Sequence, residues 1–245
     1  MSSPDAGSTR LQDAIRFALD KHAHQFRKGT DRPYILHPLE VMLLLSAMNA
    51  DTDLLMAGVL HDTVEDTDAT LPELEARFGP GVAGLVGAHT DDKSLPWQKR
   101  KAKAVVELAR ADRRVQMLVL ADKVSNLRSM ARDHARVGEA LWDRFHAPKE
   151  QQSWYYSVSQ DALQPMVDDP DAREVYWEMT ALYKDLFVSY GLDTTGEVLY
   201  QYAAHGEAYR LRREHPYWEA CPVPECLLAP VSRAAAETLE DLWRL

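Results

Sequence analysis

Cysteine is scarce in this chain of 245 residues, which has only Cys221 and Cys226. Two cysteines cannot build a disulfide framework, and a chain of this length can bury an ordinary core without one. This scarcity is typical of a reducing compartment, so we expect a cytoplasmic protein. The first ten residues, MSSPDAGSTR, also lack the apolar centre of a signal peptide, which favours the same compartment.

Long hydrophobic runs and an excess of positive charge are missing as well. The longest apolar runs, 41–48 and 54–60, are much shorter than the roughly 20 residues of a membrane-spanning helix. There are 28 Lys and Arg against 38 Asp and Glu, which gives a formal charge of −10. Nucleic acids and anionic membranes attract positive surfaces, so we expect neither as a partner.

The acidic excess lies almost entirely in the second half of the chain. Residues 1–135 hold 18 basic and 19 acidic residues, whereas residues 136–245 hold 10 and 19. The first half also contains a basic run made of Lys93, Lys99, Arg100, Lys101 and Lys103. Such a run is either a solvated helix face or a local attraction for phosphate, so a small anionic ligand remains compatible with the overall charge.

Glycine is sparse too, with 11 residues, and alternating apolar and polar runs are hard to find. Signals of helix ends recur instead, such as Asp51 or Thr52 as a cap, Pro38 at a helix start and Gly79 after a short helix. These patterns predict an all-α protein. We expect a helical bundle domain over residues 1–190 and a C-terminal helical extension of unknown role over residues 191–245.

The strongest chemical signal is the doublet His61-Asp62 inside VLHDTVED. Near a helix end both side chains can turn toward one ion, although a single such doublet is a weak signal. His37 precedes it at the start of a predicted helix, and Asp122 follows it in a helix that is otherwise apolar on that side. A buried carboxylate needs a cation or a hydrogen-bonded partner. Two His and two Asp suit a divalent transition metal, with Mn, Fe, Co and Zn all admissible.

Two further acids, Glu65 and Asp66, follow four residues behind His61 and Asp62. They therefore project from the same side of the helical turn, where they can hold or deprotonate a water molecule at the metal without being ligands themselves. A purely structural alternative is an acidic helix terminus.

Four separate blocks of the sequence resemble the HD-domain hydrolases of the RelA/SpoT type. The resemblance is strongest to the single-domain small alarmone hydrolases related to the metazoan SpoT homologue, and it covers roughly residues 8–165. The matching blocks are HQFRKGTDRPYILHP (24–38), AGVLHDTVEDT (57–67), TDDKSLP (90–96) and LADKVSNLRSM (120–130).

This resemblance implies an HD-domain helical bundle that binds one Mn²⁺ and removes the 3′-diphosphate of (p)ppGpp, giving GDP or GTP and pyrophosphate. Such a hydrolase degrades the alarmone of the stringent response. By position, the implied metal ligands are His37, His61, Asp62 and Asp122, and the implied water-activating residues are Glu65 and Asp66. The implied contacts to the guanine nucleotide are Arg27, Lys28, Asn126 and Ser129.

The sequence departs from the long bifunctional relatives at a few positions. Position 125 is Ser where they usually carry His, and the loop before His37 differs in length, which leaves the partner of Arg32 open. The remaining tail is too short for a synthetase domain, so we expect a chain that degrades alarmone and does not make it.

Alternative readings remain open. The metal centre could act on another 3′-phosphorylated nucleotide, such as NADPH or an adenine alarmone, or the chain could be an HD-fold module that senses a nucleotide. The tail could mediate self-association into a homo-oligomer or shield the cleft. Five other histidines lack a nameable partner and are expected on the surface or in loops: His22, His24, His89, His134 and His146. A zinc site at His215, Cys221 and Cys226 is disfavoured because a fourth ligand is missing.

Overall fold

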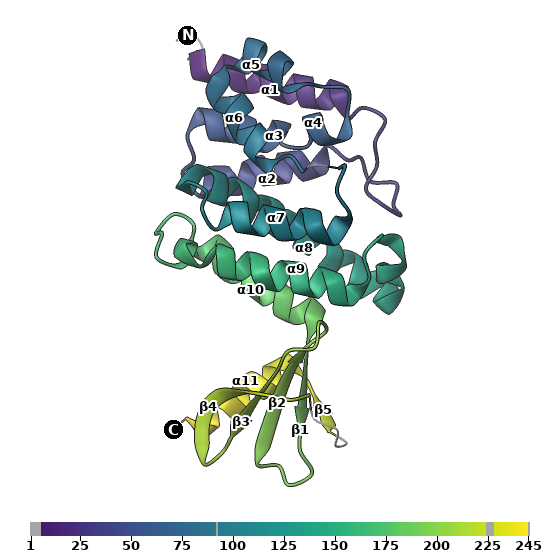
Figure 1. The fold of residues 1–245 in the computed structure, drawn as a ribbon, viewed down its shortest axis with the longest axis vertical. Coiled ribbons are helices and arrows are strands. Elements are labelled where there is room, and N and C mark those ends of the chain that lie inside the picture. The colour runs from purple at the N-terminus through teal and green to yellow at the C-terminus, as the bar shows by residue number, and fades with distance from the viewer. Residues whose placement is uncertain (1–5, 92, 224–227, 245) are drawn as a thin grey trace.

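The chain folds into two parts placed end to end: a helical body, and a small sheet with one helix against it (Figure 1). The structure is a computed structural model that describes residues 6–91, 93–223 and 228–244. The helical body takes up residues 6–187, and the sheet begins at the next residue. No helix in these described ranges is long and apolar enough to cross a membrane.

The helical body is a stack of antiparallel and crossing helices around one large core. Its elements are α1 (Ala6–Lys21), α2 (Leu36–Ala47), α3 (Thr52–Leu60), α4 (Thr63–Asp66), α5 (Leu71–Phe78), α6 (Pro80–His89), α7 (Trp97–Leu108), α8 (Arg113–Val137), η1 (Gly138–Arg144), α9 (Lys149–Ala162), η2 (Gln164–Val167) and α10 (Arg173–Phe187).

Local signals in the sequence explain where the central helices begin and end. The Asp51 carboxylate accepts a hydrogen bond from the Leu54 amide at 3.0 Å and so caps α3. Asp112 caps α8 in the same way through the amide of Val115. Gly79, with φ of 94°, separates α5 from α6 in a conformation that side chains disfavour. The long helix α8 runs through the centre of the body and contacts both α2 and α10.

Helices α2 and α3 approach each other closely at Gly58. A Cβ atom at this position would lie 2.5 Å from Cδ1 of Leu45 on α2, which is closer than carbon atoms can pack. Both helices are almost entirely apolar on the side that meets, and Leu45 and Leu60 are fully buried. This close contact brings the ends of α2 and α3 to the same place in the core.

The C-terminal part is a five-stranded antiparallel sheet and not the helical extension that the sequence led us to expect. Its strands are β1 (Val188–Leu192), β2 (Val198–Ala203), β3 (Ala208–Arg212), β4 (His215–Cys221) and β5 (Ala229–Val231), in the order β4-β3-β2-β1-β5. Helix α11 (Arg233–Trp243) packs on one face. The all-α fold class is therefore wrong for this part of the chain, while the body is helical as expected.

The residues of this region explain why it forms a sheet and not helices. The strands carry Val, Tyr and Trp at high density, side chains that fit a pleated surface, and Leu199 lies opposite Leu211 in the register. Gly196 and Gly206 have φ of 76° and 99° in the two turns that join β1 to β2 and β2 to β3.

The two parts are joined without a linker, since α10 ends at Phe187 and β1 begins at Val188. Arg233 of α11 donates to Asp185 at 2.7 Å and to the Ala181 carbonyl at 2.9 Å, both on α10. His205, in the turn between β2 and β3, lies 2.8 Å from the hydroxyl of the buried Ser153 on α9. The sheet therefore rests on the last two long helices of the body.

Candidate metal centre and cleft

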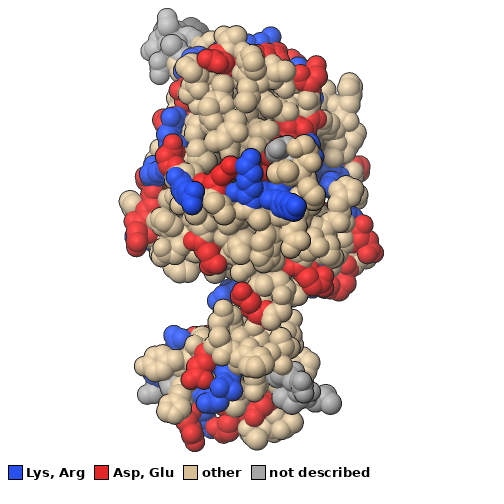
Figure 2. Space-filling view, in the orientation of Figure 1, with Lys and Arg blue, Asp and Glu red and all other residues tan. Residues whose placement is uncertain are grey.

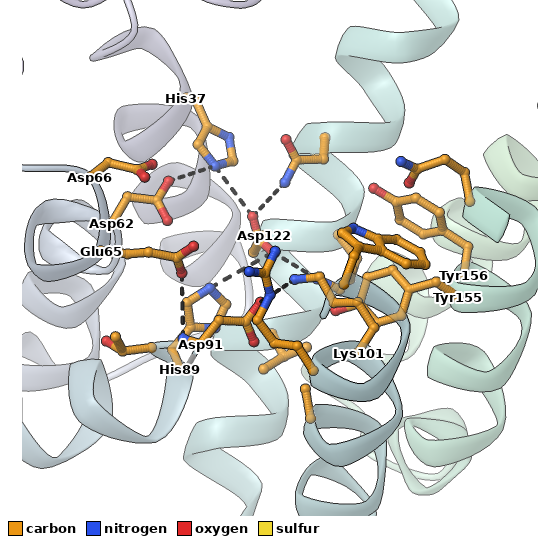
Figure 3. Close-up of a pocket in the computed structure, with 18 of the residues that line it drawn as sticks. His37, Asp62, Glu65, Asp66, His89, Asp91, Lys101, Asp122, Tyr155 and Tyr156 are labelled. Atoms are coloured by element: carbon orange, nitrogen blue, oxygen red, sulfur yellow. Dashed lines mark hydrogen bonds and ion pairs between the residues drawn. The ribbon is translucent and has the colours of Figure 1, made fainter. Parts of the chain in front are cut away.

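A large cleft of about 1370 Å³ opens in the helical body, and the side chains of all four sequence blocks line it. Figure 3 shows acids and histidines on one side of this cleft and the rings of Tyr155 and Tyr156 on the other. The acidic side is built from the ends of α2, α3, α4 and α6 together with the middle of α8.

The predicted metal ligands come from three separate elements. His37 is the second residue of α2, and Asp122 lies in the middle of α8. His61 and Asp62 fill the short junction between α3 and α4, where the chain changes direction between two helices. That junction allows two neighbouring side chains to face the same point.

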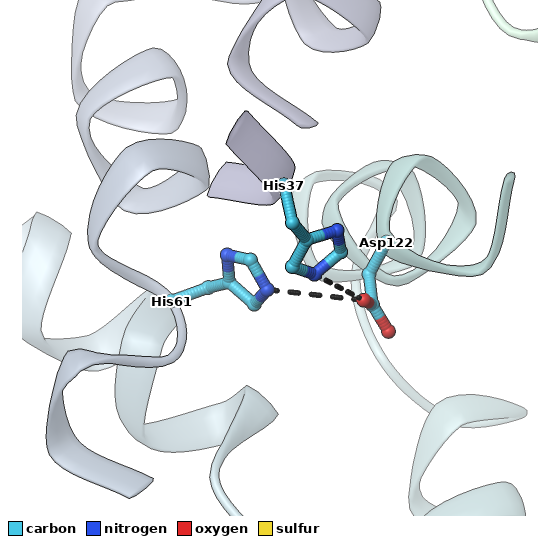
Figure 4. Close-up of side chains that lie close together, drawn as sticks. All are labelled: His37, His61 and Asp122. Carbon is cyan, nitrogen blue, oxygen red and sulfur yellow. Dashed lines mark ion pairs between the residues drawn. The ribbon is translucent and has the colours of Figure 1, made fainter. Parts of the chain in front are cut away.

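These four side chains converge in the core (Figure 4 shows three of them). His37 Nε2 lies 3.2 Å from Asp122 Oδ1 and 3.4 Å from Asp62 Oδ2. His61 Nε2 lies 3.0 Å from Asp62 Oδ2 and 3.8 Å from Asp122 Oδ1. Ligands of one ion with bonds of about 2.1 Å are separated by about 3 to 4 Å, so the spacing fits a single cation.

Hydrogen bonds orient both rings with Nε2 toward this point. Nδ1 of His61 donates to the Gly58 carbonyl at 2.8 Å. Nδ1 of His37 lies 2.8 Å from the Ser125 hydroxyl, which in turn donates to Glu40 at 2.8 Å. Because Ser125 gives its proton to Glu40, its oxygen accepts the Nδ1 proton of His37. Each ring thus directs its Nδ1–H away from the centre, and in its neutral form it can offer the lone pair of Nε2, as metal-bound histidines do.

The electrostatics of the centre favour positive charge. Burial alone would raise the pKa of Asp62, but His61 and His37 hold it well below its usual range. Asp122 is also buried, and its pKa is held low by Lys123, which donates to it at 3.0 Å, and by His37. Burial would lower the pKa of His61, yet the two carboxylates outweigh it and raise the pKa to about 9. The same negative field would stabilise a divalent cation.

One atom tests directly whether a metal fits here. His61 Nε2 is completely buried and has no hydrogen-bond partner among the described residues, although it points between two carboxylates. A buried nitrogen without a partner is costly unless something else satisfies it. The mixed nitrogen and oxygen donors His37, His61 and Asp122 form one group that could hold an ion. The residues present therefore fit a divalent transition metal.

Glu65 and Asp66 lie on α4 at the edge of the centre, held by Lys93. Lys93 Nζ donates to Asp66 at 2.9 Å and to the Glu65 carbonyl at 2.6 Å. Burial and the carboxylates of Asp62 and Asp91 raise the pKa of Glu65. A carboxylate with a raised pKa in a cleft has the property that a general base needs near neutral pH.

On the other side of the centre, the expected substrate residues form a chain of contacts. Arg27 donates to the side-chain oxygen Oδ1 of Asn126 at 2.8 Å, and the side-chain Nδ2 of Asn126 donates to Asp122 at 2.6 Å. The Arg27 guanidinium also lies 5.6 Å from the centre of the Tyr34 ring. Lys28 is exposed, and both it and Ser129 line the cleft. All four expected contact residues therefore border the same space.

The opposite wall is aromatic and basic. Tyr155 and Tyr156 are buried in the core, and they also line the cleft. Lys101 and Lys123 lie 5.1 and 4.9 Å from the centre of the Tyr155 ring. Figure 2 shows basic side chains gathered over α7 on the visible face. Lys101 pairs with Asp91, which precedes α7, and Lys103 pairs with Glu107 on α7 itself. These nearby acids partly neutralise the basic run.

Comparison with known proteins identifies the family of this chain. Residues 14–150 match the HD domain family. The chain is 42% identical over 126 residues to guanosine-3′,5′-bis(diphosphate) 3′-pyrophosphohydrolase MESH1 of Drosophila melanogaster, covering 50% of this chain and 70% of the relative. It is 43% identical over 128 residues to human MESH1, covering 51% and 72%. The chain belongs to the HD-domain family of the MESH1 proteins. The resemblance inferred from the four sequence blocks is thereby confirmed.

Solved structures agree with this assignment. A metazoan ortholog of SpoT that hydrolyses ppGpp is 30% identical, with a TM-score of 0.60, and the match covers 76% of this chain and 98% of that structure. A Listeria monocytogenes EGD-e protein is 32% identical with a TM-score of 0.56, covering 60% and 96%. HD hydrolases are metal-dependent phosphohydrolases, and the HD domain of this chain has a His and Asp cluster that could hold a metal ion.

Sequence reasoning missed several residues of the HD-domain centre. His89 was expected on the surface or in a loop, but its side chain is only 11% exposed and faces Asp122. The Tyr34 hydroxyl donates to Asp62 at 2.6 Å, and only its place three residues before His37 could have suggested this. Glu40 was not recognised because it acts through Ser125.

The other histidine predictions had mixed outcomes. His22 is buried and lies 2.7 Å from the Gln25 side chain, so its expected surface position is wrong. His134 lies at the surface beside Glu139, as expected. His215 and Cys221 both lie on strand β4, while Cys226 lies outside the described residues.

Proposed function

We propose that this chain hydrolyses the 3′-diphosphate of ppGpp or pppGpp at a divalent-metal centre, releasing pyrophosphate and GDP or GTP. The observation that carries the proposal is the convergence of His37, His61, Asp62 and Asp122 at one buried point, next to the Glu65-Asp66 pair. MESH1 proteins, named for this same reaction, share 42% identity with the chain over the region that holds these residues.

The four converging side chains would hold the ion, and Mn²⁺ is our first choice. Carboxylate ligands suit Mn²⁺, and the two Asp supply them, while the two His keep other divalent transition metals admissible. When bound, such an ion would polarise a phosphoryl oxygen and lower the pKa of a water molecule. Lys123 neutralises the face of Asp122 turned away from His37, because it donates to Oδ2 while His37 faces Oδ1.

Glu65 is the proposed general base. It would take a proton from water as the water oxygen bonds to the phosphorus atom attached to the ribose 3′-oxygen. The bond from phosphorus to the 3′-oxygen then breaks, the pyrophosphate leaves, and the 3′-oxygen takes up a proton. Asp66 would orient the water, because Lys93 already fixes its carboxylate beside that of Glu65.

Arg27, Lys28, Asn126 and Ser129 are the proposed contacts to the nucleotide. Arg27 offers a flat guanidinium that can lie against a purine ring, and its bond to Asn126 fixes its position. Lys28 is exposed at the rim and can meet a phosphate group. The rings of Trp97 and Tyr155 on the opposite wall, 6.0 Å apart, give the cleft a second surface for a flat base.

The deciding experiment is turnover of ppGpp by the purified protein in the presence of Mn²⁺, with products separated by anion exchange. We expect GDP and pyrophosphate in equal amounts. Bound metal without any such products would overturn the proposal. Parallel reactions with NADPH and with an adenine alarmone test the alternative substrates, and faster turnover of either one would replace ppGpp as the assigned substrate.

A matched pair of variants separates chemistry from folding. Asp66→Asn changes a proposed water-orienting residue, whereas Asp68→Asn changes an acid two residues away that pairs with Lys21 at the surface. We expect turnover to fall in the first variant and to stay at the wild-type level in the second.

A further inference from the structure

His89 is the side chain near the metal centre that the proposed function does not use. It is the last residue of α6 and belongs to none of the motifs that define the expected ligand set. Its side chain is 11% exposed and lines the cleft. Figure 3 shows His37 and His89 on opposite sides of Asp122.

The distances place His89 within reach of the same point as the other ligands. Its Nε2 atom lies 3.8 Å from Asp122 Oδ2, and its ring centre lies 5.0 Å from that of His61. His61, Asp62 and His89 form a second group whose ligand atoms all lie within 4.8 Å of one another. This group shares His61 with the group of His37, His61 and Asp122, so the two groups adjoin each other.

A common ion requires only a small adjustment of the His89 ring. Two atoms that are each about 2.1 Å from one ion are at most about 4.2 Å apart. The ligand atoms of the second group exceed that limit by about 0.6 Å at most, since their upper bound is 4.8 Å. No hydrogen bond to a described residue ties the His89 ring elsewhere, and its ion-pair neighbour in the described chain is Asp122.

We propose that His89 is a fifth protein ligand of the metal centre, so that three imidazoles and two carboxylates bind one ion. The inference rests on the metal centre of the proposed function, but it does not depend on which nucleotide is the substrate. Imidazole ligands favour Co²⁺, Ni²⁺ and Zn²⁺ more than they favour Mn²⁺. A third imidazole therefore gives this chain a stronger preference for those ions than the set of two His and two Asp would have.

The first test compares metal affinity in the wild type and in His89→Gln by calorimetry with Co²⁺ and with Mn²⁺. Even residues behind a ligand change metal affinity by about 10- to 100-fold, so loss of a direct ligand is expected to weaken Co²⁺ binding at least about tenfold. The loss for Mn²⁺ is expected to be smaller. His134→Gln is the matched control, because that histidine pairs with Glu139 at the surface, and it should bind both ions as the wild type does.

The second test counts the imidazoles bound to Co²⁺ in the wild-type protein, with His89→Gln as the comparison. Each histidine bound to Co²⁺ through Nε2 keeps a proton on Nδ1, which gives one strongly shifted, exchangeable proton resonance. We expect three such resonances in the wild type and two in His89→Gln. Two resonances in the wild type, or equal Co²⁺ affinity in both proteins, would overturn the proposal.

The stoichiometry separates the remaining outcomes. One ion per chain is expected, and two ions would show that His89 belongs to a separate site. A wild-type chain that binds no divalent metal would overturn both this inference and the proposed function. Three resonances without turnover of ppGpp would uphold the role of His89 and overturn only the substrate assignment.

Discussion

The helical body and the C-terminal sheet bury very different kinds of side chain. The body encloses a large apolar core and, inside it, the charged or polar groups of His37, His61, Asp122 and Lys123. Among the described residues, the core cluster of the sheet and α11 has four buried members, all apolar or aromatic: Tyr190, Leu199, Leu211 and Ala236. Buried charges are costly and need dense surroundings that hold each partner in place. The large core therefore supports the chemistry, and the small core supports only its own fold.

The sharpest test of this contrast is His61→Ala. We expect metal binding to be lost and turnover to fall at least about 1000-fold, because the ring lies at the meeting point of both ligand groups. The sheet should be unaffected. Calorimetric metal titration and a turnover assay measure the first effect, and hydrogen exchange of strands β1 to β3 measures the second. Loss of exchange protection in strands β1 to β3 would show that the stability of the sheet depends on the metal centre in the body.

Glu65→Gln tests whether turnover can be lowered without a change in metal affinity. Removing a general base is expected to lower kcat by about 10²- to 10⁴-fold. Metal affinity should change little, since Glu65 is not one of the converging ligands. Steady-state kinetics with a parallel metal titration gives both values. A variant with wild-type kcat would remove Glu65 from the mechanism.

Ser125→Ala tests the link from Glu40 through Ser125 to His37. The hydroxyl fixes the proton of His37 on Nδ1, so its loss should weaken metal binding by about 10- to 100-fold. Ser125→Thr keeps the hydroxyl and should bind metal nearly as the wild type does. Calorimetry measures the metal affinity of both variants. Equally weakened metal binding in both would point to a packing effect at position 125 instead.

Lys93→Met should move the pH dependence of turnover. Burial and nearby carboxylates raise the pKa of Glu65, whereas Lys93 lowers it. Without Lys93 the pKa of Glu65 rises further, so the carboxylate form that accepts a proton is lost at a higher pH. The acidic limb of the profile of kcat/KM against pH should therefore shift upward. A limb that stays in place would mean that another group controls it.

Leu199→Ala is expected to have the smallest effect on turnover. Leu199 is fully buried in the sheet, and truncating such a residue costs about 2–5 kcal/mol of stability. Turnover in the body should stay within about twofold of the wild type, because distant sites act independently. Hydrogen exchange and kinetics on the same sample measure both effects. A large loss of turnover would show that the contact between His205 and Ser153 transmits the disturbance to α9.

The sequence predicted the body far better than the sheet, and particular residues explain why. The capping of α3 by Asp51 and the spacing of Asp122 and Asn126 are local signals, and the structure has both. Tyr200 and Tyr202 lie on β2, inside the range for which the sequence predicts a helical extension, because aromatic residues occur in helix packing as well as in strands. Contacts across the chain, such as Tyr34 with Asp62, leave no local pattern and needed the folded structure.

The position of His89 near the centre is another feature that depends on contacts across the chain. Nothing in the residues around it marks a ligand, because its neighbours come from α3 and α8 and not from its own helix. Its position depends on how α6 packs against both of these helices. The residues implied by the family resemblance, in contrast, could be named from four short blocks.

Gly58 connects the packing of the body to its chemistry. Its missing side chain lets α3 lie against Leu45, and its carbonyl fixes the ring of His61. A methyl group at this position would force Leu45 or the backbone of α3 to move, and with it the carbonyl that orients the ring of His61. We therefore expect Gly58→Ala to weaken binding of a divalent ion as well as to lower stability.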